Sequence, residues 1–142
     1  MDLLARTFLP AATAGGLDLP AIGRHLPVFR RYLGTDAVLL VTRCTRPARP
    51  FGGYVLALTR NRLVVVQESR VVHRLRLHLD APLDELSEVS WRGDSTGTTV
   101  ELSATAIDGV RERFAIRRHP GALDRALRLA FGDGPPPLSS AA

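Results

Sequence analysis

The sequence predicts a mainly β domain with α-helices: seven antiparallel strands form a partly open barrel, a C-terminal helix caps it, and a helical segment precedes it. Two observations predict this fold class. Strand patterns joined by short turns extend from Asp36 to Ile116, and an amphipathic helical pattern follows them. With 142 residues, the chain is long enough for one domain with its own hydrophobic core.

The N-terminal residues predict helices. A short helix is expected to end near Pro10, ahead of a flexible stretch that contains Gly15 and Gly16. A second helix follows Asp18, a good N-cap residue, and Pro27 is expected to kink or split it before it ends at Gly34. Its apolar residues recur three and four positions apart: Leu19, Ile22, Leu26, Phe29 and Leu33.

Seven strand patterns follow, at residues 37–45, 53–59, 63–68, 71–80, 88–92, 98–105 and 110–117. Short hairpins at Arg60-Asn61 and Asp108-Gly109 join two of the pairs. The clearest alternation lies in residues 71–80, where one face is expected to carry Val71, His73, Leu75, Leu77 and Leu79. A helix from Pro120 to about Phe131 then presents Leu123, Leu127 and Phe131 on one side.

Four segments follow one another in a characteristic order: Leu26 to Asp36, the hairpin from Gly53 to Val66, the turn and strand from Pro82 to Val89, and Pro120-Gly121-Ala122 at the start of the last helix. In this order they resemble the bacterial pleckstrin-homology-like (PH-like or GRAM-like) domain family. The resemblance covers residues 26–131. It implies two near-orthogonal antiparallel sheets whose open corner the last helix plugs, and a module that binds partners. Residues 1–25 are then an N-terminal helical and flexible arm, and residues 132–142 a disordered tail.

Composition limits the setting of the protein. The net charge is +5, and all nineteen cationic residues are arginines. A GC-rich genome explains this composition, although arginine also suits an anionic partner. Cys44 is the only cysteine, which excludes an intramolecular disulfide and favours a reducing compartment. The N-terminus lacks the features of a signal peptide, and no apolar run approaches the roughly 20 residues that span a bilayer, so we expect a cytoplasmic protein.

No catalytic or metal site is expected. Gly93-Asp94-Ser95-Thr96-Gly97 matches the nucleophile-elbow pattern of esterases, but strand patterns flank it on both sides, which indicates a hairpin loop. His73 and His78 are expected on opposite faces of one strand, too far apart to bind one metal ion. Cys44 is interpreted as an apolar filler, and no cofactor is expected.

The candidate ligand-binding residues are arginines of the first hairpin loops: Arg43, Arg46, Arg49, Arg60 and Arg62. The preferred hypothesis is a non-enzymatic PH-like module that binds another protein, with the N-terminal arm as a further docking element or as the contact of a homo-oligomer. The alternative is peripheral binding to anionic lipid headgroups through these five arginines. Nucleic acid is not expected as a partner because aromatic residues are few.

Overall fold

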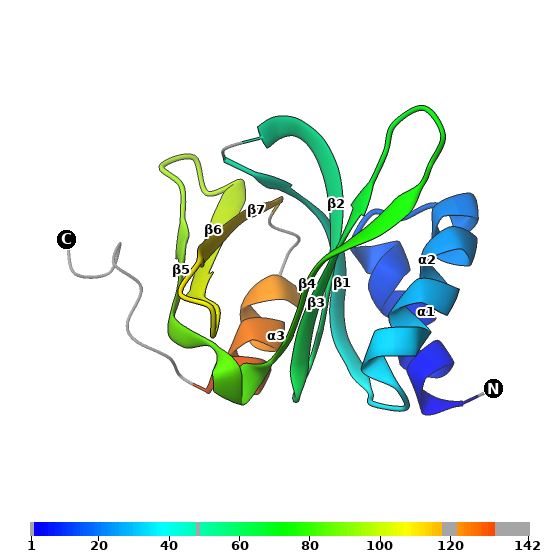
Figure 1. The fold of residues 1–142 in the computed structure, drawn as a ribbon, viewed down its shortest axis with the longest axis horizontal. Helices are drawn as coiled ribbons and strands as arrows, with labels where there is room; N and C mark the ends of the chain where they lie inside the picture. Colours follow the sequence, from blue (N-terminus) through cyan, green and yellow to red (C-terminus); the bar gives the residue numbers. More distant parts are fainter. Residues whose placement is uncertain (1, 48, 118–121, 133–142) are drawn as a thin grey trace.

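A computed structural model describes residues 2–47, 49–117 and 122–132 (Figure 1). Within this part of the chain the strands form a single antiparallel sheet, in the order β4-β3-β2-β1-β7-β6-β5. Their bounds are β1 Val38–Arg46, β2 Arg49–Thr59, β3 Arg62–Glu68, β4 Leu75–Pro82, β5 Ser87–Gly93, β6 Thr99–Thr105 and β7 Arg111–Arg117. No ladder between described residues joins β4 to β5, so the barrel is open there. The predicted fold class is confirmed.

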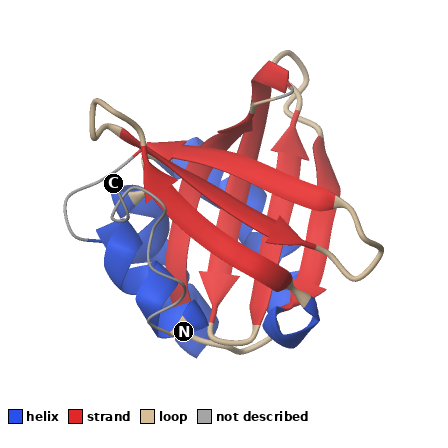
Figure 2. Cartoon of the chain, turned by 90° about the vertical axis from the view of Figure 1, so that its left-hand side faces the viewer, coloured by secondary structure: helices blue, strands red, loops and turns tan. Residues whose placement is uncertain are grey.

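The sheet bends so that β5–β7 cross β1–β4 at a steep angle (Figure 2). Two helices, α1 (Leu3–Ala14) and α2 (Leu19–Leu33), cover the outer face of β1–β4. A third helix, α3 (Ala122–Phe131), lies between the two halves of the bent sheet (Figure 1). A one-turn 3-10 helix at Leu83–Glu85 connects β4 to β5. We call the side of each strand that faces α3 the inner face.

Both N-terminal helices start at an aspartate. The carboxylates of Asp2 and Asp18 accept hydrogen bonds of 3.0 Å from the backbone amides of Ala5 and Ala21, which would otherwise lack partners in the first helical turn. An ion pair between Asp2 and Arg30 ties the start of α1 to the end of α2. Each helix therefore begins where a capping residue satisfies its free amides.

The two prolines do not end or split these helices, contrary to the prediction. α1 continues past Pro10 to Ala14, so the stretch expected to be flexible is partly helical, and α2 is continuous through Pro27. Apolar or aromatic side chains are buried on both sides of each proline, Phe8 and Ala12 in α1, His25 and Phe29 in α2. This burial outweighs the hydrogen bond that a proline removes. The boundary expected after residue 25 falls inside α2.

Apolar residues form two cores, one on each side of β1–β4. The outer core joins α1 and α2 to the strands and includes Leu4, Phe8, Phe29, Val41 and Val64. The inner core joins both halves of the bent sheet to α3, and it includes Leu56, Leu102, Phe114, Leu123 and Leu127. Because β1–β4 are covered on both faces, β2 and β3 are buried along continuous apolar runs rather than at alternate residues.

β4 departs from the predicted alternation. It begins at Leu75 rather than Val71, because residues 69–74 form a turn in which His73 adopts a left-handed φ of 52°. Val65 pairs with Leu79 and Val66 pairs with Leu77, so His78 is an extra residue in a β-bulge. The bulge reverses the faces: Leu75 packs against the outer core and Leu79 against the inner core.

The C-terminal helix caps the barrel as predicted. Leu123, Ala126 and Leu127 are buried in the inner core, and the ring of Phe131 lies 6.2 Å from that of Trp91 on β5. The helix start expected at Pro120 and the tail from residue 133 onward lie outside the described residues.

Candidate binding face

The outer face of β5–β7 is the sheet surface that no described helix covers. Figure 2 looks onto this face, with the three strands in front. In β6 and β7 alternate residues are buried, which directs the remaining side chains outward. The outward residues are polar, cationic or small: Ser90, Arg92, Thr99, Glu101, Ser103, Thr105, Arg111, Arg113, Ala115 and Arg117.

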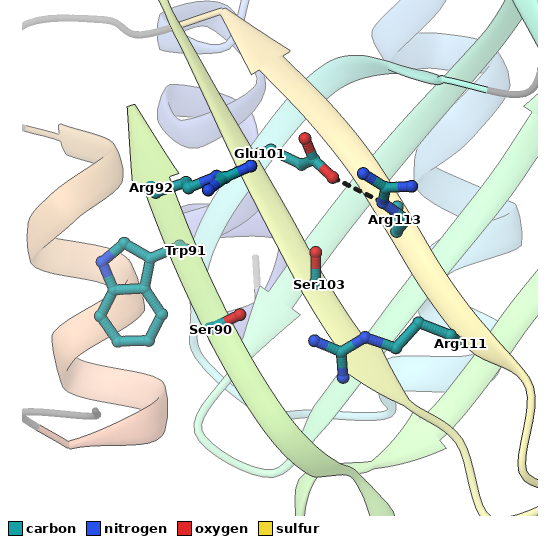
Figure 3. A pocket seen from close by; sticks show the side chains of 7 residues that line it. All are labelled: Ser90, Trp91, Arg92, Glu101, Ser103, Arg111 and Arg113. Atoms are coloured by element: carbon teal, nitrogen blue, oxygen red, sulfur yellow. Dashed lines mark hydrogen bonds and ion pairs between the residues drawn. The ribbon is translucent and has the colours of Figure 1, made fainter. Parts of the chain in front are cut away.

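A shallow hollow of about 340 Å³ lies on this face, and side chains from all three strands line it (Figure 3). Ser90 and Ser103 lie in its middle, while the guanidinium groups of Arg92, Arg111 and Arg113 lie around them. The indole of Trp91 points away toward α3. The hollow thus presents hydroxyl groups and guanidinium groups, which are hydrogen-bond donors suited to carboxylate or phosphate oxygens.

Two of the three arginines are held in place. The Nε atom of Arg113 donates a 2.6 Å hydrogen bond to Oε1 of Glu101. Nη1 of Arg111 donates to the backbone carbonyl of Glu88 at 2.7 Å and to the hydroxyl of Thr105 at 3.0 Å. Held guanidinium groups lose less conformational entropy when a ligand binds.

A bulge in β5 provides the carbonyl that holds Arg111. The register of β5 on β6 shifts between Ser87 and Ser90, and Glu88 has a left-handed φ of 52°. The Glu88 carbonyl lies within this irregularity and accepts the hydrogen bond from Arg111. The local irregularity of this edge strand positions one wall of the hollow.

The hollow has an excess of positive charge. Glu101 is the only carboxylate that lines it, and Arg113 already pairs with that carboxylate. Arg92 is exposed and has no ion-pair or hydrogen-bond partner among the described residues. Arg111 lies 4.0 Å from the exposed Glu88 carboxylate, so Arg92 is the guanidinium of the hollow that can accept an anionic group without displacing an existing ion pair.

The five arginines predicted as a site are not brought together. Arg60 and Arg62 lie at the β2–β3 turn, whereas Arg46 and Arg49 lie beside the β1–β2 turn, at the other end of β2. Arg62 pairs with Asp80 at 2.9 Å, while Arg60 and Arg49 are exposed. The β1–β2 and β2–β3 hairpin turns follow each other in the sequence, but they lie at opposite ends of β2.

Arg43 points to the outer side of β1, toward a buried carboxylate. Glu68 is 8% exposed and pairs with Arg24 at 2.9 Å and with the buried His25 at 3.3 Å. Arg43 and His73 approach the same carboxylate at 3.7 and 3.4 Å. Burial alone would raise the pKa of Glu68, but the hydrogen bonds from His25 and Arg24 outweigh it and lower that pKa. Arg43 is therefore partly engaged within the fold.

Arg46 points to the inner side of β1, toward a second buried carboxylate. Glu112 on β7 receives a 2.9 Å contact from Nε2 of His78 and lies 4.0 Å from Arg46. The guanidinium of Arg46 also lies over the ring of Tyr54, 5.8 Å from its centroid. Arg43 and Arg46 thus face opposite sides of the sheet, and each interacts with a buried acid.

The serine and the cysteine considered as possible nucleophiles, Ser95 and Cys44, both have structural roles. Ser95 lies in the hairpin loop between β5 and β6, as predicted, and the Asp94 carboxylate accepts hydrogen bonds from the backbone amides of Thr98 and Thr99. Cys44 is buried, and burial raises the pKa of its thiol well above the usual range. Among the described residues no helix is long and apolar enough to cross a membrane.

Sequence reasoning missed the arginines of β5 and β7 as candidates. The signal was present, because the alternation that places Glu101 and Ser103 outward on β6 also places Arg111 and Arg113 outward on β7. The antiparallel register then sets Ser103 opposite Arg113 and Ser90.

No protein-family model matches this chain, and a search of the curated proteins finds no match.

Proposed function

We propose that this chain is a non-enzymatic PH-like binding module whose chief partner is another protein, and that the partner docks on the outer face of β5–β7. The observation that carries the proposal is the exposed, arginine-lined hollow of that face. The other large sheet faces are occupied, because α1 and α2 cover one side of β1–β4 and α3 fills the other. The exposed face is therefore the surface best placed to receive a partner.

The setting of Ser95 supports a non-enzymatic role. A serine nucleophile needs a strand-to-helix turn that exposes its hydroxyl and a histidine that takes its proton. Ser95 instead follows Asp94 in an exposed turn between two antiparallel strands. The hollow of Figure 3 has serines, but none of the histidines that the structure describes lines it.

Site-specific photo-crosslinking tests the docking face. A photoreactive amino acid replaces Ser103 in the hollow, or Arg31 on the exposed side of α2 as the control, and crosslinked proteins from the native host are identified by mass spectrometry. The partner is then purified, and its affinity is measured for the parent protein and for the Arg92→Glu/Arg113→Glu variant. We expect a crosslink from position 103 only, and an affinity about tenfold weaker or more for the variant. Equal crosslinking from both positions, or an unchanged affinity, would reject this docking face.

A specific observation favours membrane binding as the second candidate function. The hairpin between β3 and β4 projects from the body of the molecule (Figure 1), and Val71 and Val72 at its tip are 90% and 72% exposed. Arg70 and Arg74 flank these valines in the sequence. An apolar tip between cations can enter the interface of an anionic membrane. The lipid contact proposed here uses different residues from the five arginines predicted for it.

Flotation with vesicles distinguishes this second candidate. We expect vesicles that contain anionic lipid to carry the protein, neutral vesicles not to carry it, and the Val71→Ser/Val72→Ser variant to lose flotation. If flotation is absent, or persists in that variant, the β3–β4 hairpin is not a membrane contact.

A further inference from the structure

The hollow of Figure 3 continues into two more hollows along the same side of the molecule. A second hollow, of about 390 Å³, shares Arg92 and Glu101 with the first. A third, of about 470 Å³, shares Thr99 and Ala115 with the second and ends at Gly15 and Gly16, after α1. We call the three together the trough. It extends from β5 across the ends of β6 and β7 to β1 and the α1–α2 turn.

Arginines dominate the charged groups of the trough. Of the arginines that the structure describes, five line it: Arg43, Arg92, Arg111, Arg113 and Arg117. Two carboxylates also line it, and both are engaged, Glu101 with Arg113 and Asp94 with the amides of its own loop. Those loop hydrogen bonds, together with one from the Thr96 hydroxyl, lower the pKa of Asp94 although burial alone would raise it. Arg92 and Arg117, in different hollows, are exposed and have no partner among the described residues.

The floor of the trough is made of small residues. Ser90 and Ser103 lie in the first hollow, Thr99 and Ala115 in the middle, and the exposed Gly16 at the far end. Small side chains leave room for a ligand backbone to lie close to the sheet. Three hollows in series suit an extended chain better than a single small anion.

The described part of the chain gives the trough no exposed aromatic side chain on which nucleic-acid bases could stack. Among the described residues Trp91 is the one aromatic residue that lines it, and its ring packs against Phe131 of α3 rather than facing the trough. Proteins that bind single-stranded nucleic acid combine cations with exposed aromatic rings. The absence of such rings along the trough favours a polypeptide as the extended anionic ligand.

We propose that the trough binds an extended, acidic segment of a partner protein, whose aspartate or glutamate side chains pair with Arg92, Arg111 and Arg117. This inference rests on the proposed function and adds the chemistry of the segment and its path past the α1–α2 turn. Alternate side chains of an extended segment point the same way, so acidic residues at every second position would all face the arginines. The guanidinium groups would bind these carboxylates through paired hydrogen bonds.

Fluorescence anisotropy with a defined peptide tests the proposal. The probe is a labelled peptide of alternating glutamate and serine, about twelve residues or ~40 Å long when extended. The matched probe has glutamine in place of glutamate. We expect the acidic peptide to bind about tenfold more tightly or better, with an affinity that falls as salt increases. Amide chemical shifts should change at Ser103, Thr99 and Gly16, one residue in each hollow.

Charge-reversal variants locate the site. Arg92→Glu/Arg117→Glu removes the two unpartnered cations, and Arg6→Glu/Arg31→Glu makes the same charge change on exposed residues of α1 and α2. We expect the first variant to weaken binding about tenfold or more and the control to change it less than about twofold. If both variants lose the same affinity for the acidic peptide, the effect comes from net charge alone, and the trough is rejected as the binding site.

Two other outcomes would also overturn the inference. One is tighter binding of a single-stranded oligothymidine than of the acidic peptide. The other is equal binding of the glutamate and glutamine peptides. If the crosslink from position 103 identifies a partner while the acidic peptide fails to bind, the docking face stands and only the acidic chemistry is rejected. If both fail, the proposed function fails with the inference.

Discussion

Gly15 lies so close to Val41 that a β-carbon on this glycine would be 1.7 Å from the Val41 carbonyl oxygen. The contact seats the end of α1 directly on β1, and the amide of Arg43 donates to the Gly15 carbonyl at 3.5 Å. The φ of Gly15 is −83°, which any residue adopts, so the requirement for glycine here is purely steric.

Replacing Gly15 by alanine should therefore destabilise the protein. The atoms nearest to that position are backbone atoms of Val41 and Thr42 in β1, which cannot move aside as a flexible side chain would. We expect Gly15→Ala to lower the free energy of unfolding by about 1–3 kcal/mol or more in urea denaturation. Gly23→Ala is the control, because nothing lies within 4 Å of its β-carbon position in α2, and it should raise stability by roughly 0.5–1 kcal/mol. An unchanged stability for Gly15→Ala would show that α1 does not need this close approach.

The contact between His78 and Glu112 should couple the two halves of the barrel. It joins β4 to β7 across the inner side of the bent sheet, with 2.9 Å between Nε2 and Oε1. A double-mutant cycle of His78→Leu and Glu112→Gln should give a coupling energy of about 1–2 kcal/mol. The more exposed pair of Arg113 and Glu101 should give less than about 1 kcal/mol in the same cycle. If the two coupling energies are equal, burial adds nothing to the inner pair.

Because α3 caps the barrel, loss of one of its buried apolar side chains should lower the free energy of unfolding strongly. Leu127 is fully buried between α3 and the strands, so Leu127→Ala should lower the free energy of unfolding by about 2–5 kcal/mol. Leu129 on the same helix is 44% exposed, and Leu129→Ala should change stability by less than about 0.5 kcal/mol. Chemical denaturation followed by far-UV circular dichroism measures both. Similar losses for the two variants would contradict the role of α3 as a cap.

The general architecture was predictable because it depends on local patterns. Alternation in β6, turn residues such as Asp108-Gly109 and the apolar side of α3 each specify an element by themselves. The helices around Pro10 and Pro27 were not predictable locally, since their continuity depends on burial against β1–β4. The face reversal in β4 depends on the bulge at His78, for which the alternating sequence gives no sign.

The candidate site was harder to predict than the fold. Grouping arginines by nearness in the sequence joined Arg46 with Arg62, which the antiparallel pairing of β1–β3 places at opposite ends. Arg92 and Arg113 are far apart in the sequence, and only the register of β5–β7 brings them to one hollow. Strand order had to be known before the arginines could be sorted into a site.

His25 should make stability depend on pH near neutrality. Its ring is fully buried, Nε2 faces Glu68 at 3.3 Å, and Nδ1 has no hydrogen-bond partner within the described part of the chain. Burial lowers the pKa of His25 below its usual value of about 6.5, although Glu68 acts in the opposite direction. Arg24 and Arg43, from α2 and β1, also disfavour a second positive charge, while His73 approaches the same carboxylate.

The sign of the effect follows from proton binding. Because the unfolded chain binds a proton at His25 more readily than the folded chain does, the free energy of unfolding should fall as the pH drops below about 6.5. His25→Gln keeps a donor for Glu68 but cannot titrate, so it should lose this part of the pH dependence. His73→Gln, at a 53% exposed position, should keep it. Urea denaturation at a series of pH values measures all three proteins, and parallel curves for the parent and His25→Gln would show that His25 does not limit stability in acid.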